Sequence, residues 1–206
     1  MNKTITFWFG LIGALLFIGS SIIGGFLMEN YSPIKQFISE SYAIDTSHGI
    51  YIRLFGYIPS GVLITLFSFS ALKFIKNLSL ARVGLIIFGI FYGISTIVVG
   101  IFPCDSGCNK ELINPSISQF IHNISGALTY LIVPISLILI GIAANKWNNG
   151  KLISTISISS GVIAILFSFM LSSNATGNFI GLYQRIIEGS ILFWLINFAF
   201  YIKNIK

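Results

Sequence analysis

Six apolar runs, each long enough to cross a lipid bilayer, divide this chain of 206 residues. They cover residues 5–28, 55–75, 82–102, 122–144, 152–172 and 179–202. A helix needs about 20 apolar residues to span the hydrocarbon core, whereas a transmembrane strand is shorter and alternates in polarity. These runs are continuously apolar, and in lipid a helix satisfies its own backbone hydrogen bonds. We therefore predict an all-α, polytopic membrane protein with one domain, a six-transmembrane-helix bundle over residues 1–206.

The charged residues are few and unevenly placed. They make up 9% of the chain, against about 25% in soluble domains, which excludes a soluble fold. Basic residues concentrate in the cytoplasmic loops of membrane proteins, so we predict that the more basic side faces the cytoplasm. This orientation places both termini in the cytoplasm, and we expect the protein in the cell membrane. No contiguous basic patch suggests nucleic-acid binding, and the lipid bilayer is the expected partner. One side receives Lys3, Lys73, Lys76, Arg82, Lys146, Lys151, Lys203 and Lys206, and the other receives Lys35, Arg53, Lys110 and Arg185.

Two long connections, residues 29–54 and 103–121, fall on the predicted extracytoplasmic side. Connections longer than about 12–15 residues are often functional. In the first, Ile34, Phe37, Ile38 and Tyr42 recur at helical spacing and predict a short amphipathic helix at the membrane interface. Every acidic residue, histidine and cysteine also falls on this side of the membrane, so any site is expected there.

Cys104 and Cys108 lie four residues apart just after the third run. On the oxidising face of a membrane such a pair can close a small disulfide loop, which is our leading prediction. Unpaired thiols are the first alternative. A zinc site is the second, but it needs four ligands, usually from two clusters, so we predict no metal site.

Asp105 follows the third run and His122 opens the fourth. If the intervening loop brings them together, a carboxylate beside an imidazole is suited to proton transfer or metal binding. The alternative is that His122 makes only a local hydrogen bond at the interface.

The sixth run carries Arg185 and Glu188 three residues apart, so the two side chains share one helix face and can pair. Ionisable groups inside a membrane cost about 2.5–3.5 kcal/mol on insertion scales and usually face the bundle interior. They are therefore candidates for function. The structural alternative is a pair that fastens this helix to Glu40 or Asp105.

Sequence motifs for other chemistry are missing. No Gly-x-Ser-x-Gly elbow, Walker loop or dinucleotide-binding loop occurs, and two histidines are too few for a three-histidine zinc hydrolase. We therefore expect no cofactor.

Several short motifs resemble a known family. Ile38-Ser39-Glu40, Phe102-Pro103-Cys104-Asp105, His122 and Gly181-Leu182-Tyr183-Gln184-Arg185 followed by Glu188 stand in the order found in the bacterial and archaeal six-span family called domain of unknown function 998. The resemblance covers nearly the whole chain and implies six membrane helices. The layout is more distantly similar to a eukaryotic six-span group of autophagy modulators and lipid-remodelling proteins, which implies lipid handling.

We predict an extracytoplasmic polar pocket that binds a small amphiphile or lipid headgroup, with Arg185 meeting an anionic group. The first alternative is a membrane enzyme in which Asp105 and His122 are the catalytic acid–base pair or metal ligands. Proton-coupled transport and a purely structural bundle are the others. The residues predicted to line the pocket are Glu40, Asp105, His122, Arg185 and Glu188.

Overall fold

The computed structural model describes residues 2–75 and 80–205. Lys76 and Lys206, two of the basic residues on the predicted cytoplasmic side, lie outside these ranges. Six helical spans are long and apolar enough to cross a membrane, and the described residues contain no strand, so the predicted fold class is confirmed. The spans are α1 (Lys3–Leu27), α2–η2–α3 (Gly49–Ile52, Arg53–Tyr57, Ile58–Ala71), α4–η3–α5 (Leu80–Phe88, Gly89–Ile94, Ser95–Ile101), α6 (Ile117–Ala144), α7 (Lys151–Ser173) and α8 (Ile180–Asn204).

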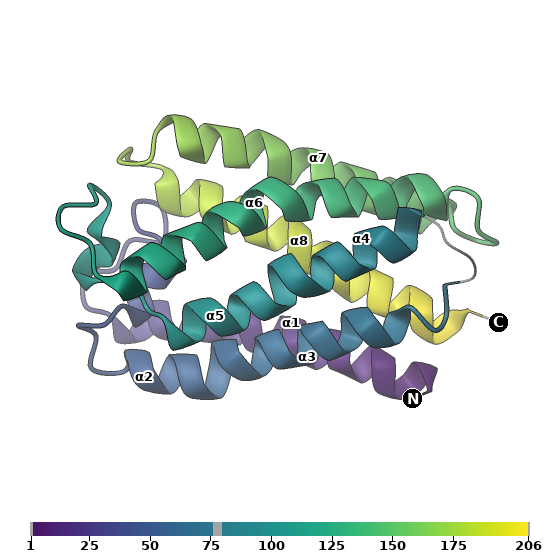
Figure 1. The fold of residues 1–206 in the computed structure, drawn as a ribbon, viewed down its shortest axis with the longest axis horizontal. Coiled ribbons are helices and arrows are strands. Elements are labelled where there is room, and N and C mark those ends of the chain that lie inside the picture. The colour runs from purple at the N-terminus through teal and green to yellow at the C-terminus, as the bar shows by residue number, and fades with distance from the viewer. Residues whose placement is uncertain (1, 76–79, 206) are drawn as a thin grey trace.

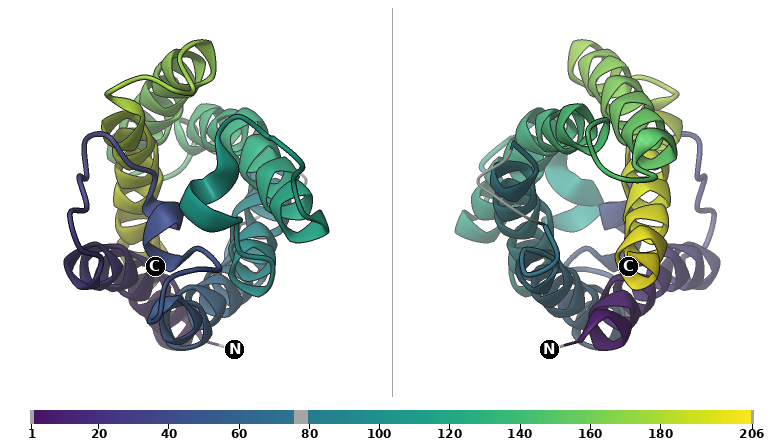
Figure 2. Two further views of the ribbon diagram at one scale, coloured as in Figure 1. Left: turned by 90° about the vertical axis from the view of Figure 1, so that its left-hand side faces the viewer. Right: turned by 90° about the vertical axis from the view of Figure 1, so that its right-hand side faces the viewer.

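The spans form a closed ring. Each contacts the next in the order α1, α3, α4–α5, α6, α7 and α8, and α8 contacts α1 again. Figure 2 shows this ring from both ends. Both termini lie at one end of the bundle, and the long connections lie at the other, which we call the loop end (Figure 1).

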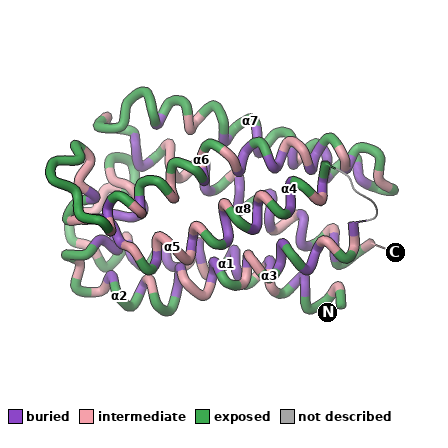
Figure 3. Tube along the Cα trace, in the orientation of Figure 1, coloured by how far each residue is buried: buried purple, intermediate pink, exposed green. Residues whose placement is uncertain are grey.

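Burial follows the ring. Buried and exposed residues alternate along each span, as the colours of the trace in Figure 3 show. Many exposed side chains are large and apolar, including Phe26, Leu152 and Phe169. In water such a surface would be unfavourable, but acyl chains are as apolar as these side chains. The bundle is therefore built for a lipid environment.

Four spans begin and end within about two residues of their predicted bounds, and the second and fourth differ by more. The second begins at Gly49 and ends at Ala71, and the fourth begins at Ile117, five residues before His122. Ser116 explains the latter start, because its hydroxyl accepts the Gln119 N–H at 3.0 Å and caps the helix. Hydropathy detects the apolar middle of a span, whereas polar caps decide its end.

Both long connections fold onto the loop end of the ring. The first contains the 3₁₀ helix η1 (Ile38–Tyr42) and the second contains η4 (Ser106–Asn109), and both lie over the middle of the ring in Figure 2. Ile44 N–H donates to the Cys104 carbonyl at 3.0 Å, and Ser106 donates to Asp45 at 2.6 Å. We call this two-part cover the lid. Of the segment expected to form an amphipathic helix at the membrane interface, residues 38–42 are instead a buried 3₁₀ turn inside the lid, and Ile34 before it is exposed.

Small residues let the spans approach closely. A Cβ on Gly61 would lie 2.7 Å from the Gly93 carbonyl oxygen and 2.8 Å from the Ile97 nitrogen. A Cβ on Gly161 would lie 2.7 Å from the Pro134 carbonyl oxygen. These neighbours are backbone atoms, which cannot move aside as a flexible side chain can, so the glycines set the helix spacing.

The variant Gly61→Ala should therefore destabilise the bundle by about 1–3 kcal/mol, the usual cost of overpacking. We expect a lower midpoint of thermal unfolding in detergent. Gly19→Ala is the matched control, because nothing lies within 4 Å of its added Cβ. Equal unfolding midpoints for the two variants would contradict the close packing at Gly61.

Candidate functional site

A buried glutamate lies at the centre of the polar groups inside the ring. Glu188 is 7% exposed and sits on α8, eight residues below the start of that helix. At 1.5 Å per residue this is a depth of about 12 Å. Tyr92 donates to Glu188 Oε2 at 2.8 Å, and Tyr130 donates to Oε1 at 2.8 Å. The carboxylate thus joins η3, α6 and α8.

The backbone around Tyr92 is unusual. Tyr92 lies in η3, a π-helical segment within the third span. Such segments change the direction of the following side chains and are frequent at functional sites. Here the π-helical segment carries Tyr92, whose hydroxyl lies beside the Glu188 carboxylate inside the ring.

A hydrogen-bond chain connects Glu188 to the lid. The backbone N–H of Ile38 donates to Gln184 Oε1 at 2.6 Å, and Gln184 Nε2 donates to the Tyr130 oxygen at 2.9 Å. The chain then continues through the Tyr130 hydroxyl to Glu188. A displacement of η1 would therefore disturb the group that orients Tyr130.

A cavity of about 760 Å³ extends from this cluster to the lid. Its walls are mostly apolar, with a minority of polar groups, which is the usual make-up of a small-molecule site. The polar and aromatic groups that line it include Phe17, Ser39, Tyr42, Tyr92, Thr96, Cys108, Lys110, His122, Asn123, Tyr130, Gln184 and Glu188.

The cavity also reaches the outer face of the ring between α6 and α7. These helices diverge towards the loop end (Figure 1). They are held together at the other end, where Ser154 Oγ donates to the Gly141 carbonyl at 2.7 Å. Leu131 of α6 and Phe169 of α7 line the cavity and are 67% and 72% exposed. We call this opening the side mouth. Leu131 follows Tyr130 directly, so the mouth lies near the depth of Glu188.

His122 lines the cavity but makes a local contact. Its Nδ1 lies 3.0 Å from the Phe102 carbonyl oxygen, which can only accept, so the ring nitrogen donates. The side chain is 8% exposed, and its ring lies 6.3 Å from that of Tyr42. His122 is thus oriented by the end of the third span.

Asp105 does not join His122. Its carboxylate accepts from the Ser116 N–H at 3.0 Å and from the Ser116 hydroxyl at 2.5 Å, beside the start of α6. These hydrogen bonds, the backbone one foremost, hold the pKa of Asp105 below its ordinary value. The contact stabilises the fold above the usual carboxyl pKa of about 3.9 and is lost as the pH falls through the lowered value. The geometry assigns Asp105 to a loop–helix junction.

Arg185 is directed away from Glu188, contrary to the predicted pair. Its Nη1 donates to the carbonyl oxygens of Pro33 at 2.7 Å and of Gln36 at 3.0 Å, and its Nη2 donates to the Tyr31 hydroxyl. A guanidinium has several donors in one plane and can bind several backbone oxygens at once. Arg185 therefore fastens the first connection to α8 and is not among the residues that line the cavity.

Glu40 also differs from its predicted position. It is 4% exposed, pairs with Lys110 at 2.8 Å and accepts the Phe37 N–H at 2.8 Å. It thereby joins the two halves of the lid. Its partner Lys110 lines the cavity, whereas Glu40 does not. Of the five predicted pocket residues, only His122 and Glu188 border the cavity. Glu40, Asp105 and Arg185 instead stabilise the connections and helix ends around it.

Cys104 and Cys108 form a disulfide, the pairing that their spacing favours. Both sulfurs are packed against Ser39, with the Cys108 Sγ 3.2 Å from the Ser39 Oγ. The small ring holds η4 against η1, and Cys108 borders the cavity. In the described residues no group of three or more histidine, cysteine or acidic side chains is arranged to hold a metal ion.

Sequence reasoning missed Tyr92, Tyr130, Gln184 and Lys110. The tyrosines lie within apolar runs and resemble ordinary packed aromatic residues, and Lys110 resembles an interface anchor. Gln184 did carry a signal, because a glutamine one turn before Glu188 shares its helix face.

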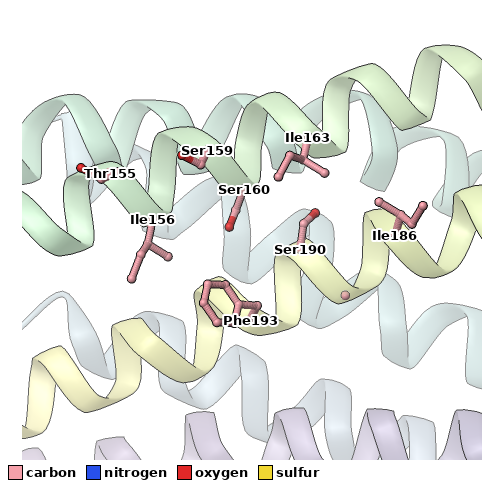
Figure 4. Close-up of a pocket in the computed structure, with 9 residues that line it drawn as sticks. Thr155, Ile156, Ser159, Ser160, Ile163, Ile186, Ser190 and Phe193 are labelled. Atoms are coloured by element: carbon pink, nitrogen blue, oxygen red, sulfur yellow. The ribbon is translucent and has the colours of Figure 1, made fainter.

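A second hollow lies on the outer surface between α7 and α8 (Figure 4). Its lining is apolar apart from hydroxyl groups such as those of Ser159 and Ser190. It contains no ionisable group, and it is separate from the cluster around Glu188.

Residues 11–201 match the family model described as Protein of unknown function (DUF998). The chain belongs to the DUF998 family. The match covers the four middle spans in full and most of the first and last, in agreement with the resemblance of the short motifs. No curated protein and no solved structure matches this DUF998 chain. The function of this DUF998 protein must therefore be inferred from its own geometry.

The role of Arg185 can be tested by hydrogen exchange measured with mass spectrometry. Arg185→Ala removes the guanidinium donors to the carbonyl oxygens of Pro33 and Gln36, and hydrogen bonds from charged groups contribute about 1.5–3 kcal/mol each. We expect amide exchange over residues 31–38 to accelerate about tenfold or more. Lys35→Ala changes an exposed charge in the same segment and should leave exchange unaltered. Unchanged exchange in Arg185→Ala would contradict the anchoring role.

Proposed function

We propose that this protein binds a membrane amphiphile in the cavity beneath the lid. The observation that carries the proposal is the shape of the cavity together with its lining. A polar cluster around Glu188 lies at its inner side, and the side mouth opens where acyl chains would surround the bundle. An amphiphile needs both environments within one site.

The size of the cavity supports this proposal. Sites for small molecules usually measure about 300–1,000 Å³, and this cavity measures about 760 Å³. That volume accommodates a polar head and part of one chain, and the rest of the chain would extend through the side mouth into the bilayer. A ligand of this kind would not have to leave the membrane to bind.

The side mouth supports access from within the membrane. The apolar side chains that combine exposure to the bilayer with a position in the cavity wall are Leu131, Ile135, Ile165 and Phe169. Tight contacts at Gly141 and Gly161 hold α6 against α7 towards the other end of the bundle, so the opening is confined to the part of these helices nearer the loop end. The lid would close the same cavity from the aqueous side.

The unequal distribution of Lys and Arg adds an orientation. It favours the loop end on the extracytoplasmic side, so we propose that the ligand is taken from the extracytoplasmic half of the bilayer. The acid–base alternative has less support, because Asp105 and His122 are each engaged by different partners, Ser116 and Phe102.

The glycine at position 126 allows a direct test. Gly126 lines the cavity, and nothing lies within 4 Å of a Cβ added there. Gly126→Phe should therefore fill part of the cavity without disturbing the helices. We expect lipid extracted from the purified variant to fall several-fold relative to the unaltered protein, measured by mass spectrometry per mole of protein.

Gly19→Phe is the matched control. It adds the same ring at another open position, on α1 and outside the cavity lining. Its lipid content should equal that of the unaltered protein. Equal lipid in Gly126→Phe and Gly19→Phe would contradict the proposed site.

A further inference from the structure

The carboxylate of Glu188 has no cationic partner among the described residues. Within the residues that the structure describes, the one ion pair joins Lys110 to Glu40. Arg185, one turn away on the same helix, is committed to the carbonyl oxygens of Pro33, Gln36 and Gly181. A carboxylate inside a membrane protein normally pairs with an opposite charge, because an unpaired one is costly.

The hydrogen-bond directions around Glu188 identify it as an acceptor. A backbone N–H can only donate, so Ile38 fixes Oε1 of Gln184 as its acceptor and leaves Nε2 to donate. Nε2 donates to the Tyr130 oxygen, and the Tyr130 hydrogen is then directed to Glu188 Oε1. Tyr92 supplies the donor for Oε2.

Acceptor capacity remains after these contacts. A carboxylate offers about four lone-pair sites, and two phenol hydroxyls occupy one on each oxygen. Glu188 also borders the cavity, so the remaining sites are available to a ligand there. A group that brings hydrogen-bond donors and a positive charge would complete the site.

Aromatic rings add a second, independent preference for a cation. Phe17, Tyr42, Tyr92 and Tyr130 all line the same cavity. The faces of aromatic rings attract ammonium groups, and this attraction grows where water is excluded.

From this arrangement we infer that the ligand carries an ammonium group, which binds Glu188 beside Tyr92 and Tyr130 while its apolar chain leaves through the side mouth. The inference rests on the proposed function and specifies the chemical class of the ligand's head group. It also replaces the expectation of an anionic group at Arg185. An anionic head would be repelled by the charge of Glu188. The guanidinium of Arg185 lies outside the cavity lining, and Lys110, which does line the cavity, is already paired with Glu40.

Photoaffinity labelling of the full chain in lipid nanodiscs tests this assignment. Three probes share one alkyl chain with a diazirine and differ in the head, which is a primary ammonium, a hydroxyl or a phosphate. We expect the ammonium probe to label the unaltered protein at least about tenfold more than the other two, as a charged hydrogen bond would give. The labelled peptides should come from the stretches of α6 and α7 that border the side mouth.

The variant Glu188→Gln keeps the size of the side chain and removes its charge. It should reduce labelling by the ammonium probe about tenfold and leave labelling by the hydroxyl probe within about twofold. Asn197→Asp, which places a charge further along the same helix and outside the cavity lining, should leave the preference unchanged. Should Glu188→Gln fail to fold, the comparison of the three heads on the unaltered protein still decides the matter.

The outcomes separate this inference from the proposed function. Equal labelling by all three heads, sensitive to Gly126→Phe, would overturn the ammonium assignment and leave amphiphile binding intact. Labelling that Gly126→Phe does not reduce would overturn amphiphile binding in the cavity itself. Competition by methylammonium at the concentration of the long-chain probe would indicate a soluble amine and would also contradict an amphiphilic ligand.

Discussion

The hydrogen-bonded carboxylate of Glu188 is the interaction on which the interior of this bundle depends. Elsewhere the ring is closed mainly by apolar packing and by the close approach of helices at small residues. At Glu188 two tyrosine hydroxyls from η3 and α6 must meet one carboxylate on α8 at 2.8 Å each. In a membrane interior such polar groups have few alternative partners, so their positions fix three spans relative to one another.

The same cluster ties the interior to the lid. Gln184 receives the Ile38 N–H and holds Tyr130, and Arg185 on the next position of α8 holds Pro33 and Gln36. Neighbouring positions on one helix thus serve two purposes. One orients the groups that face the cavity, and the other fastens the connection that covers it. The ion pair of Glu40 with Lys110 and the disulfide complete the cover.

Sequence reasoning predicted the fold well because hydrophobic length is a strong constraint in a membrane. It identified six helices and the end of the bundle where polar groups collect. The disulfide that the spacing of Cys104 and Cys108 favoured is present in the structure. Sequence reasoning could not assign partners within that end of the bundle. Arg185 and Glu188 share a helix face, yet the guanidinium finds unsatisfied carbonyl oxygens in the first connection, which no spacing rule reveals. Tyr92 was missed because its role depends on a π-helical segment that hydropathy does not detect.

The central claim is that the cavity holds an amphiphile with its head at Glu188 and its chain in the side mouth. The most direct measurement is an electron cryomicroscopy map of the protein purified from its own membrane, with a bound antibody fragment to aid alignment. We predict elongated density from hydrogen-bond distance of the Glu188 carboxylate to the gap between Leu131 and Phe169. A map in which that space is closed by side chains, or contains only isolated water-sized peaks, would contradict the claim.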